Sequence, residues 1–143
     1  MQKELIEKNP ILKLSIEFSL LLIDYCELLQ QNKKFVISRQ LLRSGTAIGA
    51  NCMETQNAES KVDFIHKIKI AAKEADETQC WLTLCDYAKD HAECEALILK
   101  LEEVHKVLNK ILATSKRKSP FSYLLSFLIS NIAFVLCIST SAH

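Results

Sequence analysis

The sequence predicts an all-α protein, an antiparallel up-down four-helix bundle with a C-terminal apolar tail outside the bundle. Two observations support this fold class. Helix breakers are scarce, with two Gly and two Pro in 143 residues, and apolar residues recur at alternating steps of three and four through four long segments. A chain of this length can bury one core without disulfides or a metal. We therefore divide it into a bundle, residues 1–118, and a tail, residues 119–143.

Asn9 and Pro10 begin the first long helix, because Asn accepts hydrogen bonds from free first-turn amides and Pro has no amide to lose. The helix carries two apolar stripes. The stripe predicted to face the core contains Ile11, Leu14, Phe18, Leu21, Tyr25 and Leu28. The second stripe contains Leu12, Ile16, Leu20 and Ile23. A helix with two apolar faces needs two partners, so we predict a homo-oligomer whose interface is the second stripe.

The same spacing continues through the second helix at Ile37, Leu41, Ser44, Ile48, Asn51 and Thr55. Its inward face is notably small and polar, with Ser44, Gly45, Thr46, Ala47, Gly49 and Ala50. Gly45 and Gly49 each lower helix propensity by up to about 1 kcal/mol, so a closely approaching neighbour must compensate. The amide of Asn51 is expected on the core-facing stripe, where leaving it unpaired costs roughly 1 to 3 kcal/mol. We therefore expect this amide to find a partner and to fix the register of the helices.

Capping signals begin the last two helices. Ser60 with Asp63 is a capping-box variant, and Asp90 with Glu93 is the next start signal. Short links between long helices favour antiparallel packing. The inward stripes are Phe64, Ile68, Ala71, Ala75, Thr78, Leu82 and Cys85, and then Leu97, Leu101, Val104, Leu108 and Ile111. The four predicted helices span about 10–31, 36–58, 61–89 and 91–114.

Catalytic and metal-binding patterns are weak. Asp63 with His66 and Glu102 with His105 resemble half of a di-iron ligand set, but the helical periodicity turns His66 and Glu102 outward. We predict no enzyme activity, no catalytic residue, no cofactor and no metal. The six cysteines include no C-x-x-C pair and follow no secretion signal, so they are expected to be packing residues of a reduced, cytoplasmic protein.

Charge is distributed unevenly along the chain. All 17 acids and 15 of the 18 bases precede Ser115, which gives the bundle a net charge of −2 and argues against broad binding of duplex DNA. Arg43 could contact phosphate, but folding the second helix back on the third sets it opposite Glu74 and Glu77. We therefore favour an ion pair within the bundle.

The stretch from Gln40 to Leu82 resembles the signature of the four-helix bundle proteins related to the 23S rRNA intervening-sequence protein, and the similarity covers about residues 9 to 114. The matching residues are Gln40, Arg43, Ser44, Gly45, Ile48, Gly49, Ala50, Asn51, Glu54, Ser60, Asp63, Phe64, Lys73, Glu74, Glu77, Thr78 and Trp81. The resemblance implies structural rather than catalytic roles for them.

The same resemblance implies a ring-shaped homopentamer. A relative, the accessory variability determinant of diversity-generating retroelements, binds a reverse transcriptase and RNA. RNA and a reverse transcriptase are therefore partners that the resemblance implies for this chain. A ring would bring together one basic pole from several copies, and Lys67 and Lys69 are the expected nucleic-acid contacts.

The tail has no charged residue from Ser119 through Ala142. Its stretch from Phe121 to Ile138 is mostly apolar and follows a basic run, as in a membrane anchor, although interspersed serines and Asn131 weaken that pattern. Three interpretations stay open: a membrane anchor, an unstructured or stray extension, and a helix packed on the bundle. The leading functional hypothesis is a homo-oligomeric scaffold with protein or RNA partners; the alternative is a tail-anchored membrane adaptor.

Overall fold

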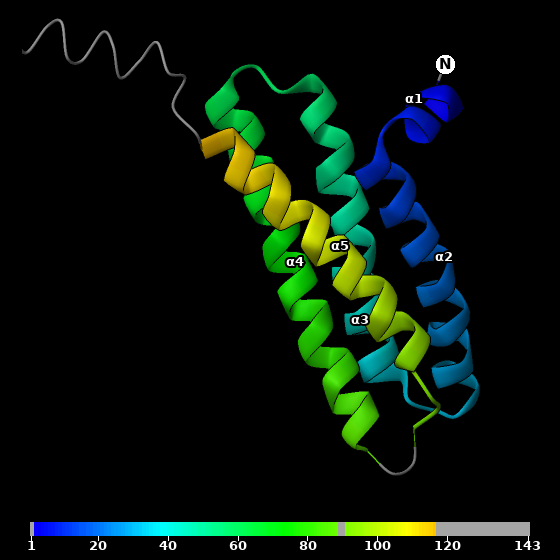
Figure 1. The fold of residues 1–143 in the computed structure, drawn as a ribbon. Coiled ribbons are helices and arrows are strands. Elements are labelled where there is room, and N and C mark those ends of the chain that lie inside the picture. Colours follow the sequence, from blue (N-terminus) through cyan, green and yellow to red (C-terminus); the bar gives the residue numbers. More distant parts are fainter. Residues whose placement is uncertain (1, 89–90, 117–143) are drawn as a thin grey trace, which may run out of the picture.

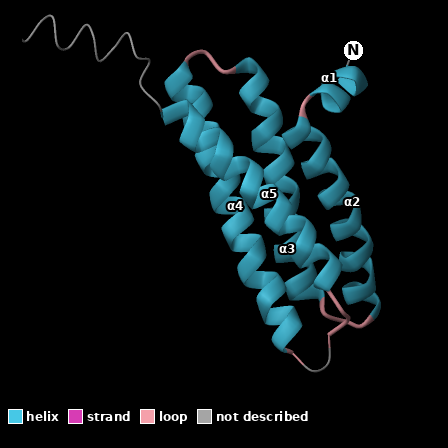
Figure 2. Ribbon diagram, in the orientation of Figure 1, coloured by secondary structure: helices cyan, strands magenta, loops and turns pink. Residues whose placement is uncertain are grey.

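The computed structural model describes residues 2–88 and 91–116, and every regular element in this part of the chain is a helix (Figures 1 and 2). The elements are α1 (Gln2–Lys8), α2 (Pro10–Gln31), α3 (Phe35–Glu54), the 3-10 turn η1 (Thr55–Asn57), α4 (Lys61–Tyr87) and α5 (Glu95–Lys116). The predicted anchor, Phe121 to Ile138, lies outside the described residues. Within them, no helix combines the length and the apolar character that crossing a bilayer requires.

The four long helices form the predicted antiparallel bundle (Figure 1). Helix α3 packs against α2 and α4, and α5 packs against α4 and α2. Diagonal pairs of these helices do not bring their described Cα atoms within 8 Å of each other. The edge between α2 and α5 is the most loosely packed of the four, so it leaves apolar side chains of both helices near the surface.

Two of the predicted helix starts are confirmed in atomic detail. The side-chain oxygen of Asn9 accepts a hydrogen bond from the backbone N–H of Ile11 at 3.3 Å, and Pro10 follows it as the first helical residue. The hydroxyl of Ser60 accepts from the N–H of Asp63 at 3.1 Å. These caps satisfy amide groups that the first turn of a helix leaves without partners.

The predicted start of the last helix at residue 91 is wrong, because residues 91–94 are not helical and α5 begins at Glu95. Contacts elsewhere in the fold hold this segment. The Tyr25 hydroxyl donates to the carbonyl of Ala92 at 3.0 Å, and the buried thiol of Cys94 lies 3.6 Å from the carbonyl of Leu82. These contacts outweigh the local start signal at Glu93; residue 90 is not among the described residues. The other predicted ends shift as well, since α3 ends at Glu54 and α4 at Tyr87.

The core face of α2 lies between the two stripes that the sequence predicts. Its buried residues are Ile11, Leu12, Ser15, Phe18, Leu22, Tyr25, Cys26 and Leu29. Leu12 is therefore a core residue, at 1% exposure, and its assignment to the oligomer face is wrong. Leu21 and Leu28 were predicted to face the core, but they remain 42% and 41% exposed beside α5. Apolar residues occur around most of this helix, so periodicity alone could not centre its core face.

Gly45 lets α3 approach α2 closely. A Cβ atom at Gly45 would overlap the Cδ2 of Leu22 and would lie 3.3 Å from the Cε1 of Phe18, and both of those side chains are fully buried. A Cβ atom at Gly49 would meet the hydroxyl oxygen of Ser15 at 3.3 Å. The close approach predicted from the two glycines is therefore present, and it is much tighter at Gly45.

Lys33 ends α2 in a conformation that usually belongs to glycine. Its φ is 61°, in the left-handed region, and its N–H donates to the carbonyl of Gln30 at 2.9 Å. The N–H of Lys34 donates to the carbonyl of Leu29 at 2.8 Å, which completes a Schellman motif. A side chain at this position costs roughly 1 to 2 kcal/mol because the Cβ crowds the following carbonyl.

Replacing Lys33 with Gly is expected to raise the free energy of unfolding by up to about 1 kcal/mol, since relief of the left-handed strain exceeds the added entropy of the unfolded chain. Urea unfolding would measure the change. The matched control is Glu27→Gly, an exposed position inside α2, where Gly should lower stability by about 1 kcal/mol. Equal destabilisation by both substitutions would show that Lys33 carries no strain.

Candidate interaction surfaces

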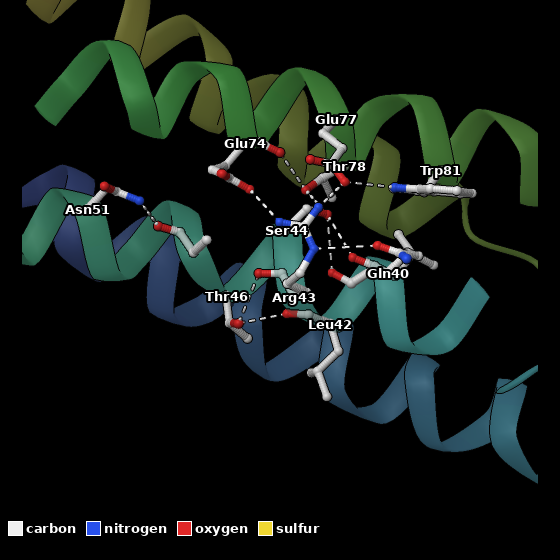
Figure 3. A network of polar contacts seen from close by, with 12 residues as sticks. Gln40, Leu42, Arg43, Ser44, Thr46, Asn51, Glu74, Glu77, Thr78 and Trp81 are labelled. Carbon is white, nitrogen blue, oxygen red and sulfur yellow. Dashed lines mark hydrogen bonds and ion pairs between the residues drawn. The ribbon is translucent and has the colours of Figure 1, made fainter. Parts of the chain in front are cut away.

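A polar network joins the outer edges of α3 and α4 (Figure 3). The guanidinium of Arg43 pairs with the carboxylate of Glu77 and lies 3.6 Å from the carboxylate of Glu74. The indole N–H of Trp81 donates to the same Glu77 carboxylate at 3.2 Å. Hydrogen bonding from Arg43, and secondarily from Trp81, lowers the pKa of Glu77. The ion pair predicted for Arg43 is present, so its charge is engaged within the bundle.

Beneath this network, two hydroxyls meet inside the core. The oxygens of Ser44 and Thr78 are 2.9 Å apart, and both residues are fully buried. Each hydroxyl also reaches a carbonyl one turn earlier in its own helix, that of Gln40 at 3.1 Å and that of Glu74 at 2.7 Å. Each of the two hydroxyls therefore has one hydrogen-bond partner in its own helix and one in the neighbouring helix, as a buried polar group requires.

Asn51 finds its partner within its own helix. Its amide nitrogen donates to the carbonyl of Ala47 at 2.8 Å, and the residue is half-buried (Figure 3). A bond inside one helix does not align two helices. The predicted role of Asn51 in helix register therefore has no contact between helices to support it among the described residues.

The two predicted nucleic-acid contacts differ in their surroundings. The ammonium of Lys67 lies 3.0 Å from the carboxylate of Glu54, and this hydrogen bond raises the pKa of Lys67. Lys69 is exposed and makes no ion pair within the described part of the chain. Asp63, another of the motif residues, is used in a helix cap, where its carboxylate accepts from the N–H of Glu59 at 3.2 Å.

The two histidines that resembled metal ligands have different surroundings. His66 is exposed, whereas His105 lies 3.2 Å from the carboxylate of Asp76. Glu102 is exposed, as predicted. Among residues 2–88 and 91–116, no three His, Cys, Asp or Glu side chains gather closely enough to hold a metal ion.

The described cysteines are free thiols. Cys26, Cys52, Cys85 and Cys94 are buried, whereas Cys80 is exposed. Burial raises the pKa of Cys52 to about 12, which disfavours the reactive thiolate. The buried thiols therefore occupy packing positions.

Three of the four residues predicted for the oligomer face lie on one outer side of α2. Leu20 is 59% exposed, Ile23 is exposed and Ile16 is half-buried, whereas Leu12 belongs to the core. Leu21 and Leu28 add exposed apolar surface on the opposite flank, toward α5. Leu21 and Leu28 belong to the stripe that the sequence predicts to face the core. The core face of α2 is rotated relative to this stripe, so the two residues lie outside the core.

The comparisons with known proteins decide the family. The model of the family described as "23S rRNA-intervening sequence protein" matches residues 7–110. The chain belongs to this family. A solved structure from Bacteroides thetaiotaomicron, described as a protein of unknown function from the S23 ribosomal protein family, is 38% identical with a TM-score of 0.68. The alignment covers 71% of this chain and 97% of the solved chain. No curated protein matches.

The stretch matched by the 23S rRNA-intervening sequence protein family includes the structural features described above. It contains α2, α3 and α4 with the network around Arg43, and it contains most of α5. Residues 111–143 lie beyond the matched stretch. Family membership therefore bears on the bundle and its surfaces, while the apolar tail from Phe121 to Ile138 has no counterpart in the comparison.

Proposed function

We propose that this chain is a non-enzymatic scaffold that associates with copies of itself through the outer side of α2, formed by Ile16, Leu20 and Ile23. The observation that carries this proposal is the exposure of large apolar side chains on a helix that already buries a full core face. Surface of this kind, collected on one side of an element, is typical of protein interfaces.

The energetics favour covering this side. Each Å² of apolar surface removed from water contributes roughly 25 cal/mol, so partial burial of three large side chains in each copy adds several kcal/mol per interface. The pentamer, and the RNA and reverse-transcriptase partners, are predictions that come from the family resemblance. Lys69 supports an RNA partner, because its ammonium group is exposed and forms no ion pair within the described residues, which leaves it available to a phosphate.

The double substitution Ile16→Glu with Leu20→Glu is expected to dissociate the assembly, because each subunit interface would then hold uncompensated carboxylates. Light scattering coupled to size exclusion would measure the mass, and far-ultraviolet circular dichroism would follow the helices. The matched control is Val62→Glu, which places the same charge at a 77% exposed apolar residue on α4.

Two results would contradict the proposal. The first is a monomeric mass for the unmodified chain at micromolar concentration. The second is loss of helical signal together with loss of assembly in the double variant, which would assign Ile16 and Leu20 to the folding of the subunit instead. Dissociation by Val62→Glu would move the interface to α4.

A further inference from the structure

Two hollows flank the start of α5. One has a volume of about 260 Å³ and is lined by Leu21, Asp24, Tyr25, Leu28, Glu93, Cys94, Ala96 and Leu97. The other has a volume of about 500 Å³ and is lined by Asp86, Glu93, Cys94, Glu95, Ile98 and Leu99. The first hollow is a groove between α2 and α5, where the end of α2 passes the start of α5. The second hollow has no described α2 residue in its lining and lies between α4 and α5.

The groove offers apolar side chains at the spacing that a bound helix requires. Leu21 and Leu28 are seven residues apart on α2, which places them on one side and about 10 Å from each other along the axis. Ala96 and Leu97 of α5 line the other side of the groove. An amphipathic helix buries its apolar stripe by lying in a groove of this kind.

The described charged residues that line the groove are both acidic. Asp24 comes from α2, and Glu93 lies just before the start of α5. Both are exposed, and neither forms an ion pair within the described residues. No Lys or Arg of the described chain lines either hollow. A partner that brings positive charge would therefore gain attraction at each side of the apolar floor.

We propose that this groove binds a basic amphipathic helix of a partner protein, with the helix's apolar stripe on Leu21 and Leu28 and its Lys or Arg side chains beside Asp24 and Glu93. The site is separate from the proposed self-association side, since Ile16, Leu20 and Ile23 do not line either hollow. Self-association and helix binding can therefore be tested independently.

The test uses the full chain and a fluorescent synthetic helix of about 18 residues, five turns long, with Leu along one stripe and Lys on both flanks. One control peptide has Glu in place of every Lys. A second has the same composition in scrambled order, so that it keeps the charge and loses the stripe. Fluorescence anisotropy should show binding of the first peptide alone, and added salt should weaken this binding because the groove's charges are exposed.

The protein variants separate the groove from general acidity. Asp24→Asn with Glu93→Gln should weaken binding about ten-fold, which is the upper range for two exposed charge contacts. Leu21→Ser with Leu28→Ser should weaken it at least as much. The control pair Glu59→Gln with Glu102→Gln removes two exposed carboxylates that do not line the groove and should leave affinity unchanged.

Three outcomes would overturn the proposal. Equal binding of the scrambled peptide would show simple charge attraction. Equal loss in the control pair would place binding elsewhere on the surface. The third outcome is that the folded, helical full chain does not bind the first peptide, and that the dissociated variant with Ile16→Glu and Leu20→Glu does not bind it either. This result would show that the groove does not accept a basic helix. The mass measurements that test self-association are unaffected by any of these results.

Discussion

Gly45→Val is expected to lower the free energy of unfolding by about 3 kcal/mol, the upper range for overpacking of a core. The added side chain would occupy the position of the Leu22 Cδ2 and would crowd the ring of Phe18. Both neighbours are fully buried, so neither can move toward solvent. Helix propensity opposes the effect by less than about 1 kcal/mol, so packing decides the sign. Chemical denaturation would measure the change.

A companion glycine in the same helix provides the control. Gly49→Ala should be neutral or should stabilise by up to about 1 kcal/mol, since the new Cβ has one tight contact, with the Ser15 hydroxyl oxygen at 3.3 Å, and a small shift relieves it. A compensating substitution sharpens the test. Leu22→Ala alone should lower the free energy of unfolding by about 3 kcal/mol. The loss in the double variant with Gly45→Val should be smaller than the two single losses added together, by at least about 1 kcal/mol. Strict additivity would show that the two side chains do not compete for one space.

Thr78→Val is expected to destabilise the bundle by about 2 kcal/mol while preserving the shape of the side chain. The substitution removes a fully buried hydroxyl that lies 2.9 Å from that of Ser44, and Ser44 then loses a partner that water cannot replace. Thermal and urea unfolding of the variant would give the size of the effect.

The double substitution Ser44→Ala with Thr78→Val should cost less than the two single changes added together, because it leaves no unmatched hydroxyl behind. Thr83→Val serves as the control: its hydroxyl also donates to a carbonyl one turn earlier on α4, at 2.8 Å, but it is exposed. A cost for Thr83→Val as large as that for Thr78→Val would mean that burial of the hydroxyl pair is not the source of the stability.

Features that depend on neighbouring residues in the chain could be predicted from the sequence. The caps at Asn9 and Ser60 are examples, since the capping atom and the amide that it satisfies are at most three residues apart. The Arg43 ion pair was also predictable, because a short link between antiparallel helices fixes which residues lie opposite each other. The fold class follows from the same local information repeated four times.

The tertiary structure decided the features that depend on which helix covers which surface. Apolar residues surround most of α2, so its sequence fits several rotations, and only packing against α3 and α5 moved Leu12 into the core and left Leu21 and Leu28 outside. The contacts of Ala92 and Cys94 delayed the start of α5. The acidic groove likewise exists only in the folded chain, because Asp24 and Glu93 are far apart in the sequence and assembly of the bundle brings them together.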